Sequence, residues 1–493
     1  MKKNLRLISA FLLGASALAA LSACGSGTAS QAEGNNAPIG SEAAAETEAP
    51  DMLDARKSVS DGLPEKDYGG KEFRVLTYDY VKADFVTDGG ETGALINDVT
   101  YRRNRDVEDR FHVTLKADGD KGLGDVSSMI KRAVTAGEDA FDLISQHMIE
   151  TANIAVSGMY LDWGEIPYVD PQKPWWNQSA YENLSINGKS YLLTGAISPA
   201  GLGGYYCVYM NKRLGADYDL NESIYQTVLD GKFTIDVYRS LIKDVYKDIN
   251  GNGTVDEGDQ FGLAAQVTSY ATPFAYAFGE ITVKHDKDGM PYLDMDADKW
   301  SAMVEKVYDL FYGGNDTITT DGWSLHSDTF LDSRALFMNG VFLHSYQRFT
   351  DFKDDYAILP YPKWNEAQAE YYTMTDGSSP LASIPVTCGD VEYAGIITEA
   401  LAAEAWKTII PTVYDVALKV RGARDETSMT VIDIIERGCV FDFGFVFSGN
   451  NGMGATFSSL MGSKKKDFAS YYEKNKKSWD KKIQNVIDSY NES

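Results

Sequence analysis

The stretch Tyr191–Asn211, YLLTGAISPAGLGGYYCVYMN, decides the fold. It contains no charged side chain, although 24% of the residues in the chain are charged. Two apolar runs of strand length, Tyr191–Thr194 and Tyr205–Met210, flank a Gly/Pro-rich centre that can continue neither a strand nor a helix. We interpret the stretch as a buried crossing, where one strand ends and a second strand begins in another lobe. A buried hairpin within one domain fits the same pattern, whereas the glycine content argues against a membrane span.

The segments on both sides of the crossing predict an α/β protein. Before it, residues 72–78 and 141–145 have the composition of buried strands, and residues 94–111 and 126–136 have the periodicity of helices. This order favours a mostly parallel sheet covered by helices. After the crossing, we predict strands at 341–346 and 356–362, and helices at 235–249, 297–311, 333–338, 396–418, 428–436 and 468–490.

The composition excludes some classes of partner. The 493 residues suffice for two or three domains, and the net charge of −26 argues against binding to nucleic acid or to anionic lipid. The chain has 30 Tyr and 8 Trp. Tyrosine and tryptophan often serve recognition because each ring has an apolar face and a polar tip, although core packing must account for many of them.

The first residues carry the pattern of a bacterial lipoprotein signal. A basic start with Lys2, Lys3 and Arg6 precedes an uncharged apolar run, and Leu21-Ser22-Ala23-Cys24 then resembles a lipobox. The pattern predicts cleavage after residue 23 and lipidation of Cys24, which would hold the protein at a membrane. Residues 24–67 lack the apolar side chains needed for a core, so we predict a disordered tether.

Three cysteines remain in the predicted mature body, namely Cys207, Cys388 and Cys439. An odd number in apolar surroundings argues against a complete disulfide framework and favours buried free thiols. One disulfide between two of them stays open at this stage.

The segment Asp248–Asp259, DINGNGTVDEGD, fits the calcium loop of twelve residues. Oxygen-bearing side chains stand at the ligand positions, with glycine at the sharp turn and aspartate where the last ligand is usually glutamate. Because a strand-like segment follows in place of a second helix, we expect a structural calcium clip. Its predicted ligands are Asp248, Asn250, Asn252, Thr254, Asp256 and Asp259.

Motifs for catalysis are weak. The five histidines form no HExxH pattern, and the NGKS segment at 187–190 lacks the first glycine of a P-loop. A pair of carboxylates for glycoside hydrolysis cannot be located or excluded among 72 acidic residues.

A series of loose motifs, in a fixed order, resembles the extracellular solute-binding proteins, family 1, of bacterial carbohydrate ABC transporters. After the lipobox come FRVLTYDY at 73–80, FDLIS at 141–145, GMYLDW at 158–163, YLLTG at 191–195, VYMNK at 208–212, SRALFMNG at 333–340 and YAILPYP at 356–362. The resemblance implies a two-lobe, periplasmic-binding-protein-like α/β fold of type II with a hinge and a ligand cleft. It assigns residues 68–195 and 376–425 to lobe 1, and residues 196–375 and 426–493 to lobe 2.

The resemblance also implies a monomeric, non-enzymatic receptor on the outer face of the membrane. The receptor would capture a carbohydrate of oligosaccharide size and deliver it to a permease. A calcium-stabilised secreted glycosidase and a receptor for another solute on the same fold are the alternatives. By position in the motifs, the predicted ligand-binding residues are Tyr80, Gln146, His147, Trp175, Trp176, Tyr205, Tyr206, Tyr346, Gln347 and Asp376. For each aromatic residue, core packing is an equally good explanation at this stage.

Overall fold

The computed structural model describes residues 52–87, 89–322, 324–349, 351–419, 426–449 and 452–492. The part of the chain from Met52 onward forms one compact unit. Among the described helices, none is long and apolar enough to cross a membrane. The predicted signal peptide, Cys24 and most of the predicted tether lie outside the described residues.

The first sheet has the strand order β12-β3-β1-β2. Its strands are β1 (Lys71–Thr77), β2 (Val113–Asp118), β3 (Leu143–His147) and β12 (Pro380–Ser383). β1 pairs in parallel with β2 and β3, whereas β12 runs antiparallel to β3. Alternate residues of β1 enter different cores, because successive side chains of a strand point to opposite faces. Phe73 and Val75 pack with α3 (Leu95–Phe111) and α15 (Val391–Lys419), and Leu76 packs with α4 (Leu123–Ala136).

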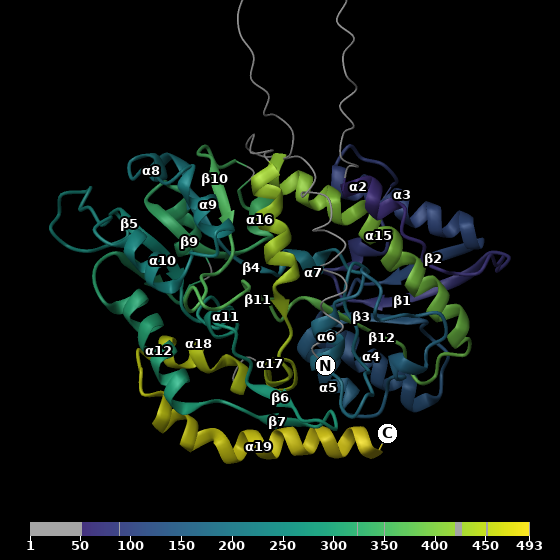
Figure 1. Ribbon diagram of the computed structural model, residues 1–493. Helices are drawn as coiled ribbons and strands as arrows, with labels where there is room; N and C mark the ends of the chain where they lie inside the picture. The colour runs from purple at the N-terminus through teal and green to yellow at the C-terminus, as the bar shows by residue number, and fades with distance from the viewer. Residues whose placement is uncertain are drawn as a thin grey trace, which may run out of the picture. The chain divides into compact units, whose positions relative to one another are not determined.

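The second sheet has the strand order β10-β4-β9-β5-β8. Its strands are β4 (Tyr206–Asn211), β5 (Phe261–Gln266), β8 (Thr317–Thr320), β9 (Ala335–Val341) and β10 (Tyr356–Leu359). β5 is parallel to β8 and β9, while β4 is antiparallel to both β9 and β10. Figure 1 shows this sheet on the left and the first sheet on the right.

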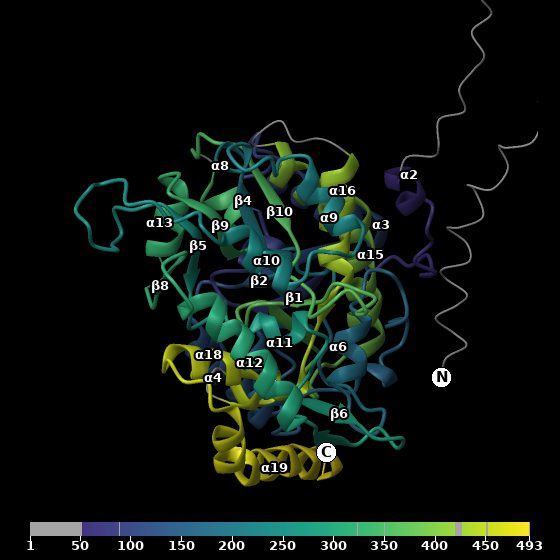
Figure 2. The same cartoon turned by 60° about the vertical axis from the view of Figure 1, so that its left-hand side comes forward.

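The remaining elements surround the sheets or connect them, and Figure 2 shows their arrangement from a second direction. The helices are α2 (Met52–Lys57), η1 (Lys82–Asp84), α5 (Met148–Ala155), η2 (Trp163–Glu165), α6 (Gln178–Asn183), α7 (Ala200–Gly203), α8 (Lys212–Ala216), α9 (Ser223–Leu229), α10 (Ile235–Ile242), α11 (Pro273–Ala277), α12 (Ala297–Tyr312), α13 (Leu325–Leu331), α14 (His344–Gln347), α16 (Glu426–Arg437), α17 (Phe443–Ser448), η4 (Met453–Ala455), α18 (Thr456–Gly462) and α19 (Phe468–Glu492). The short strands β6 (Val283–His285) and β7 (Pro291–Leu293) form one pair, and β11 (Thr373–Met374) and β13 (Cys439–Val440) form another.

The segment Tyr191–Asn211 connects the two sheets, as the sequence predicts. Leu193 exchanges two backbone hydrogen bonds, of 3.1 and 2.7 Å, with Ala382 of β12 in the first sheet. The chain then enters β4, which lies between β9 and β10 of the second sheet. The two apolar runs therefore belong to different sheets, and the hairpin alternative is wrong. The glycine-rich centre does form the short helix α7, which the sequence analysis did not predict.

Three other predictions need correction. Within residues 333–338, where a helix was predicted, residues 335–338 form the first part of β9, and α14 follows where a strand was predicted. Helix α10 ends at Ile242, seven residues before the predicted end. The sequence analysis also missed β2, which directly follows α3. Burial explains the first error, because an apolar run that is buried on all sides carries no alternation to distinguish strand from helix.

The predicted tether extends too far along the chain. Residues before 68 already include helix α2 and pack against the first lobe, where Arg110 forms an ion pair with Asp61 and Lys66 with Glu392. Val59 and Leu63 of this segment also pack, partly buried, against the core of the first lobe. The exact lobe boundaries given above stay a prediction, although all strands of the two large sheets lie within the predicted ranges. Cys207, Cys388 and Cys439 are buried free thiols.

Candidate functional site

Strand ends from both sheets meet at the crossing. β1 leads into Tyr78, whose hydroxyl donates to the Ser378 carbonyl on the returning chain, and β3 ends at His147, which pairs with Pro380. In the second sheet, β5 leads towards Tyr270, and Val341 at the end of β9 pairs with Tyr206. Ligand sites of α/β sheets form outside the carboxyl ends of strands, so the residues gathered here form a candidate site.

Asp376 and Tyr206 join the outgoing and returning chains at this point. The Tyr206 hydroxyl donates to Asp376 Oδ2 at 2.9 Å, and the Asp376 amide donates to the Gly204 carbonyl at 2.9 Å. Asp376 Oδ1 accepts from the Ser378 amide at 2.9 Å and from the Ser378 hydroxyl at 2.6 Å. Both carboxylate oxygens are therefore fixed in place, while the side chain stays half-buried.

The first lobe contributes an aromatic wall. Tyr80 is 41% exposed and stacks on Tyr78 with ring centroids 6.1 Å apart, and His147 lies edge-on to Tyr78 at 6.5 Å. His147 Nδ1 is buried without a hydrogen-bond partner. Burial lowers the pKa of His147 below 6.5, although Asp376 and Glu150 oppose this shift. A neutral imidazole can therefore face a ligand at neutral pH.

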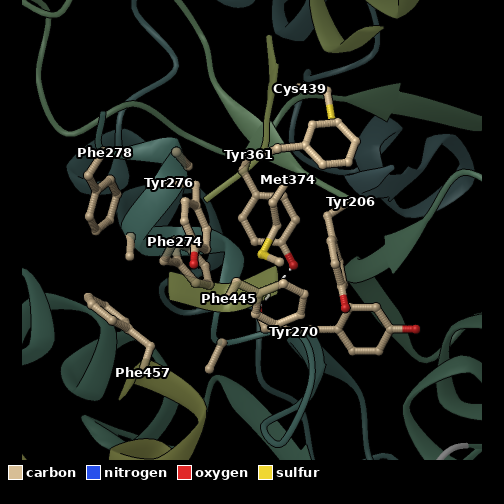
Figure 3. Packing of buried hydrophobic residues seen from close by; sticks show 14 of the residues in the cluster. Tyr206, Tyr270, Phe274, Tyr276, Phe278, Tyr361, Met374, Cys439, Phe445 and Phe457 are labelled. Atoms are coloured by element: carbon tan, nitrogen blue, oxygen red, sulfur yellow. Dashed lines mark hydrogen bonds between the residues drawn. The ribbon is translucent and has the colours of Figure 1, made fainter. Parts of the chain in front are cut away.

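The second lobe contributes a polar floor made of Tyr270, His326 and His344. The Tyr270 ring lies 5.5 Å from Tyr206 and 5.1 Å from His326, and the two imidazoles are 6.3 Å apart. Figure 3 shows Tyr206 and Tyr270 together at one edge of the buried aromatic cluster, and Tyr361 supports them by donating its hydroxyl proton to the Tyr270 carbonyl at 3.1 Å.

His326 and His344 are buried, and some of their ring nitrogens make no hydrogen bond. They are 1% and 6% exposed, and His326 Nδ1, His326 Nε2 and His344 Nδ1 have no hydrogen-bond partner. Burial, together with nearby Arg348, lowers the pKa of each imidazole to about 3, so both rings are neutral in the folded protein at ordinary pH. Buried polar atoms in native proteins nearly always have partners, and exceptions need an explanation such as a ligand or an ordered water.

Tyr346 approaches the crossing from the second lobe. Its hydroxyl lies 2.5 Å from the point where a Cβ on Gly203 would stand, so a larger residue at position 203 would displace the Tyr346 side chain. Burial raises the pKa of Tyr346, and Tyr80 and Asp84 of the first lobe raise it further. Such effects require short distances, so Tyr80 and Asp84 lie near the half-buried Tyr346. The structure thus gathers five predicted residues at one place, namely Tyr80, His147, Tyr206, Tyr346 and Asp376.

The other predicted residues lie elsewhere. Gln146 is fully buried under α4, where its Nε2 donates to the Ser127 hydroxyl at 2.7 Å. It points into the first lobe because successive strand residues alternate in direction, so its assignment to the site is wrong. Gln347 is exposed at the end of α14, and no contact places its side chain in the site. The six predicted metal ligands lie in the loop before β5, at the end of that strand opposite to Tyr270.

Trp175 and Trp176 belong to the core of the first lobe. They are 1% and 3% exposed, and their indole N–H groups donate to the two oxygens of the Glu399 carboxylate at 3.0 and 2.8 Å. Burial raises the pKa of Glu399 to about 7, and the two donors only partly oppose this shift. Both rings therefore expose almost no surface to solvent and are held by hydrogen bonds within the first lobe.

A cavity of about 420 Å³ lies beside these tryptophans. Tyr205, Trp406, Asp433 and Glu436 also line it. Tyr205 turns to this cavity and Tyr206 to Asp376, because neighbouring residues of an extended chain point in opposite directions. Gly195 allows the close packing here, since a Cβ would stand 2.1 Å from the Trp175 carbonyl oxygen. We place the candidate site on the Tyr206 side because that side has the strand ends, an exposed ring and unpartnered polar atoms.

Asp84 provides a second carboxylate near the site. It accepts hydrogen bonds from the Ser198 hydroxyl and the Ala200 amide of the crossing, and it is 9% exposed. Burial raises the pKa of Asp84 to about 6, against the effect of these donors and of Arg103. The carboxylate therefore ties the loop after β1 to the crossing.

Sequence reasoning missed Tyr270, His326 and His344. They come from three separate segments that follow β5, form α13 and begin α14. No local motif marks them, because what distinguishes them is the absence of hydrogen-bond partners in the folded protein. The count of five histidines was the one available signal.

Comparison with solved structures identifies the fold. The chain is similar to the galacto-N-biose-/lacto-N-biose I-binding protein of Bifidobacterium longum (12% identity, TM-score 0.52, 87% of this chain and 97% of that chain). It is also similar to a cyclo/maltodextrin-binding protein complexed with maltotetraose (12% identity, TM-score 0.53, 86% and 97%) and to UgpB of Mycobacterium tuberculosis in complex with glycerophosphocholine (15%, 0.52, 85% and 99%).

These likenesses confirm the predicted two-lobe α/β fold of the solute-binding proteins. No protein-family model matches the chain, and no curated protein matches it in sequence.

Proposed function

We propose that this protein is the substrate-binding component of an ABC importer. It captures a carbohydrate of oligosaccharide size between its two lobes. The observation that carries the proposal is the meeting of residues from both lobes at the crossing. Tyr80 and His147 come from the first lobe, and Tyr270, His326 and Tyr346 come from the second.

The chemistry of these residues suits a sugar. A sugar ring has an apolar C–H face and a rim of hydroxyl groups, so an exposed tyrosine ring can cover the face while polar groups bind the rim. Tyr80 offers such a ring, and the neutral imidazoles of His326 and His344 can each donate or accept a hydrogen bond. Two of the similar solved structures are named for binding sugars, which supports the same class of ligand.

The arrangement favours binding over hydrolysis. Glycosidases need two carboxyl groups free to act on the glycosidic bond and on water or the anomeric carbon. Near the site, Asp376 is fixed by Tyr206 and Ser378, and Asp84 is fixed by Ser198 and the Ala200 amide. Both carboxylates thus serve the geometry of the crossing, and we propose a non-enzymatic receptor that acts as a monomer.

We further propose that lipidation of Cys24 holds the receptor at the outer face of the cell membrane, where it delivers its ligand to a permease. Residues 1–23 would be removed, and the acyl chains on Cys24 would provide the membrane affinity. In cells, Cys24→Ala should shift the protein from the membrane fraction to the medium or to the soluble fraction. Retention of the variant in membranes after a salt wash would contradict the anchor, whatever the ligand is.

The ligand class can be tested with the chain expressed from residue 24 with Cys24→Ala. Calorimetry and thermal shift against a panel of oligosaccharides should identify at least one sugar that binds and stabilises the protein, and chromatography of the same mixtures should show no cleavage. Released products would favour the glycosidase alternative. If glycerophosphodiesters bind and no sugar does, the proposed carbohydrate ligand is wrong, while the role as a receptor stands.

A further inference from the structure

The loop between α10 and β5 is closed and has the turn geometry of a cation-binding loop. Lys247 and Gln260, which flank residues 248–259, exchange two backbone hydrogen bonds of 3.0 Å each. Gly251 and Gly253 have positive φ angles of 71° and 72°. Gly253 stands at the sixth position, where a calcium loop needs glycine for its sharp turn.

The oxygen atoms at the first, third and fifth positions turn towards the interior of the loop. Asp248 accepts from the amides of Gly251 and Gly253 at 2.7 and 2.9 Å. Asn250 Oδ1 accepts from the Asn252 amide at 2.9 Å, and Asn252 Oδ1 accepts from the Thr254 amide at 2.7 Å. Such turns also occur in ordinary polar loops, so this geometry alone assigns no metal.

Asp259, at the twelfth position, has a buried carboxylate with an unpartnered oxygen, which the turn geometry of the loop does not explain. Its side chain is fully buried at the base of the loop, where Oδ2 accepts from the Tyr246 hydroxyl at 3.0 Å and from the Asp256 amide at 3.2 Å. Its other oxygen, Oδ1, is buried and has no hydrogen-bond partner. A buried, unpartnered carboxylate oxygen is destabilising unless a cation or a donor satisfies it.

Two neutral side-chain amides occupy the oxygens of the neighbouring Asp256, where a cation would bind. The amide NH₂ groups of Asn250 and Asn252 donate to Asp256 Oδ1 and Oδ2 at 2.8 and 2.6 Å. As the loop stands, no three Asp, Glu, His or Cys side chains among the described residues converge as metal ligands. Binding of a cation would therefore require these two amide groups to release Asp256, which lowers the affinity below that of a preformed site.

We propose that residues 248–259 bind one Ca²⁺ ion and act as a structural clip in the second lobe. Oxygen atoms of Asp248, Asn250, Asn252, Asp256 and Asp259, with the Thr254 carbonyl, are the ligands. A flexible loop of six or seven oxygens suits Ca²⁺ better than Mg²⁺, which demands a rigid octahedron and keeps its water. The ion orders the entry to β5, and it does not contact the candidate ligand site, which follows the other end of that strand.

The affinity should be modest. Aspartate at the twelfth position has a shorter side chain than the usual glutamate and provides one oxygen where glutamate provides two, so a Kd of about 0.1 mM, typical of weak extracellular modules, is expected. At about 1 mM Ca²⁺ most of the protein is then loaded, and the unfolding temperature should rise by about 1–2 °C for a chain of this size.

The purified chain without residues 1–23 allows a direct test. Calcium titration by calorimetry, and Tb³⁺ luminescence excited through the nearby Tyr246 and displaced by Ca²⁺, should both show one saturable site. Asp248→Asn, at an exposed position, should weaken binding at least tenfold and abolish the calcium-dependent rise in unfolding temperature. Asp259→Asn should do the same, with circular dichroism confirming that each variant folds.

Asp286→Asn is the matched control, because Asp286 makes the same kind of turn, accepting from the Asp288 and Met290 amides, but lies in the β6–β7 hairpin outside the calcium pattern. The control should bind calcium as the unmodified protein does. The proposal is overturned if the unmodified protein shows no saturable site below about 5 mM Ca²⁺, a range wider than that of extracellular modules. It is equally overturned if Asp248→Asn binds as tightly as the control.

Discussion

Two sides of the same crossing hold aromatic clusters with different roles. On one side, Trp175 and Trp176 are almost fully buried, and both indole N–H groups bind Glu399. On the other side, Tyr80 exposes 41% of its surface, and His326 has two buried ring nitrogens without partners. The adjacent residues Tyr205 and Tyr206 divide between the two sides. Aromatic content is therefore the same signal on both sides, and the exposed ring of Tyr80 together with the unpartnered imidazole nitrogens favours the Tyr206 side as the candidate site.

The largest effect should come from the tryptophan side. Trp176→Ala removes a large buried ring and leaves one oxygen of Glu399 without its donor, so we expect a loss of about 3–5 kcal/mol in the free energy of unfolding. Denaturant unfolding gives this value, and calorimetry at a temperature where the variant stays folded gives the affinity for the best ligand. An affinity close to that of the unmodified protein is expected. A tenfold loss of affinity with little loss of stability would place the binding site on the tryptophan side.

The opposite pattern should follow from Tyr80→Ala. Loss of one aromatic anchor in a binding site typically costs a ligand about 2 kcal/mol, or roughly thirtyfold in affinity. Stability should change by less than about 0.5–1 kcal/mol, because the ring is 41% exposed and stacks on Tyr78 at the edge of the core. Tyr292→Ala is the control, since Tyr292 is 45% exposed and lies on β7, outside the site. Equal affinities for the two variants would remove Tyr80 from the proposed site.

Much of the fold followed from the sequence because its signals are local. A chain segment without charge, divided by glycine, marked Tyr191–Asn211 as the crossing, and periodicity gave α3, α12 and α19 to within a few residues. The errors occurred where local signals conflict. Residues 335–338 lie in a strand that is buried on both faces, so neither the period of a helix nor that of a strand is visible.

The site was predictable only in part. Tyr80 and His147 were predicted from their places at strand ends and Asp376 from its place where the chain returns to the first lobe, and the structure brings all three to the candidate site. The same reasoning misplaced Gln146, which is one residue earlier and so faces the opposite side of β3. His326 and His344 could not be found, because their role depends on a shortage of partners created by segments distant in the sequence.

A smaller effect should separate the two sides by pH. Burial raises the pKa of Glu399 from 4.5 to about 7, so between these values the folded protein holds a proton that the unfolded chain has released. The resulting stabilisation is complete below about pH 4.5 and is lost as the pH rises through about 7. Between about pH 5.5 and 8, the unmodified protein should therefore lose about 1–2 kcal/mol of stability that Glu399→Gln does not lose.

Denaturant unfolding of both proteins across this pH range gives the slope of the free energy of unfolding against pH for each. In the difference between the two slopes, the titration of all other groups cancels. Glu404→Gln, on the same helix, removes a half-buried carboxylate that is paired with Lys407 and does not bind the two indoles, and it should keep the slope of the unmodified protein. Parallel slopes for all three proteins would mean that Glu399 is ionised in the fold at neutral pH. The two indole donors would then lower the pKa of Glu399 by more than burial raises it. The tryptophan side would hold a buried carboxylate ion, and not the protonated carboxyl group that we infer.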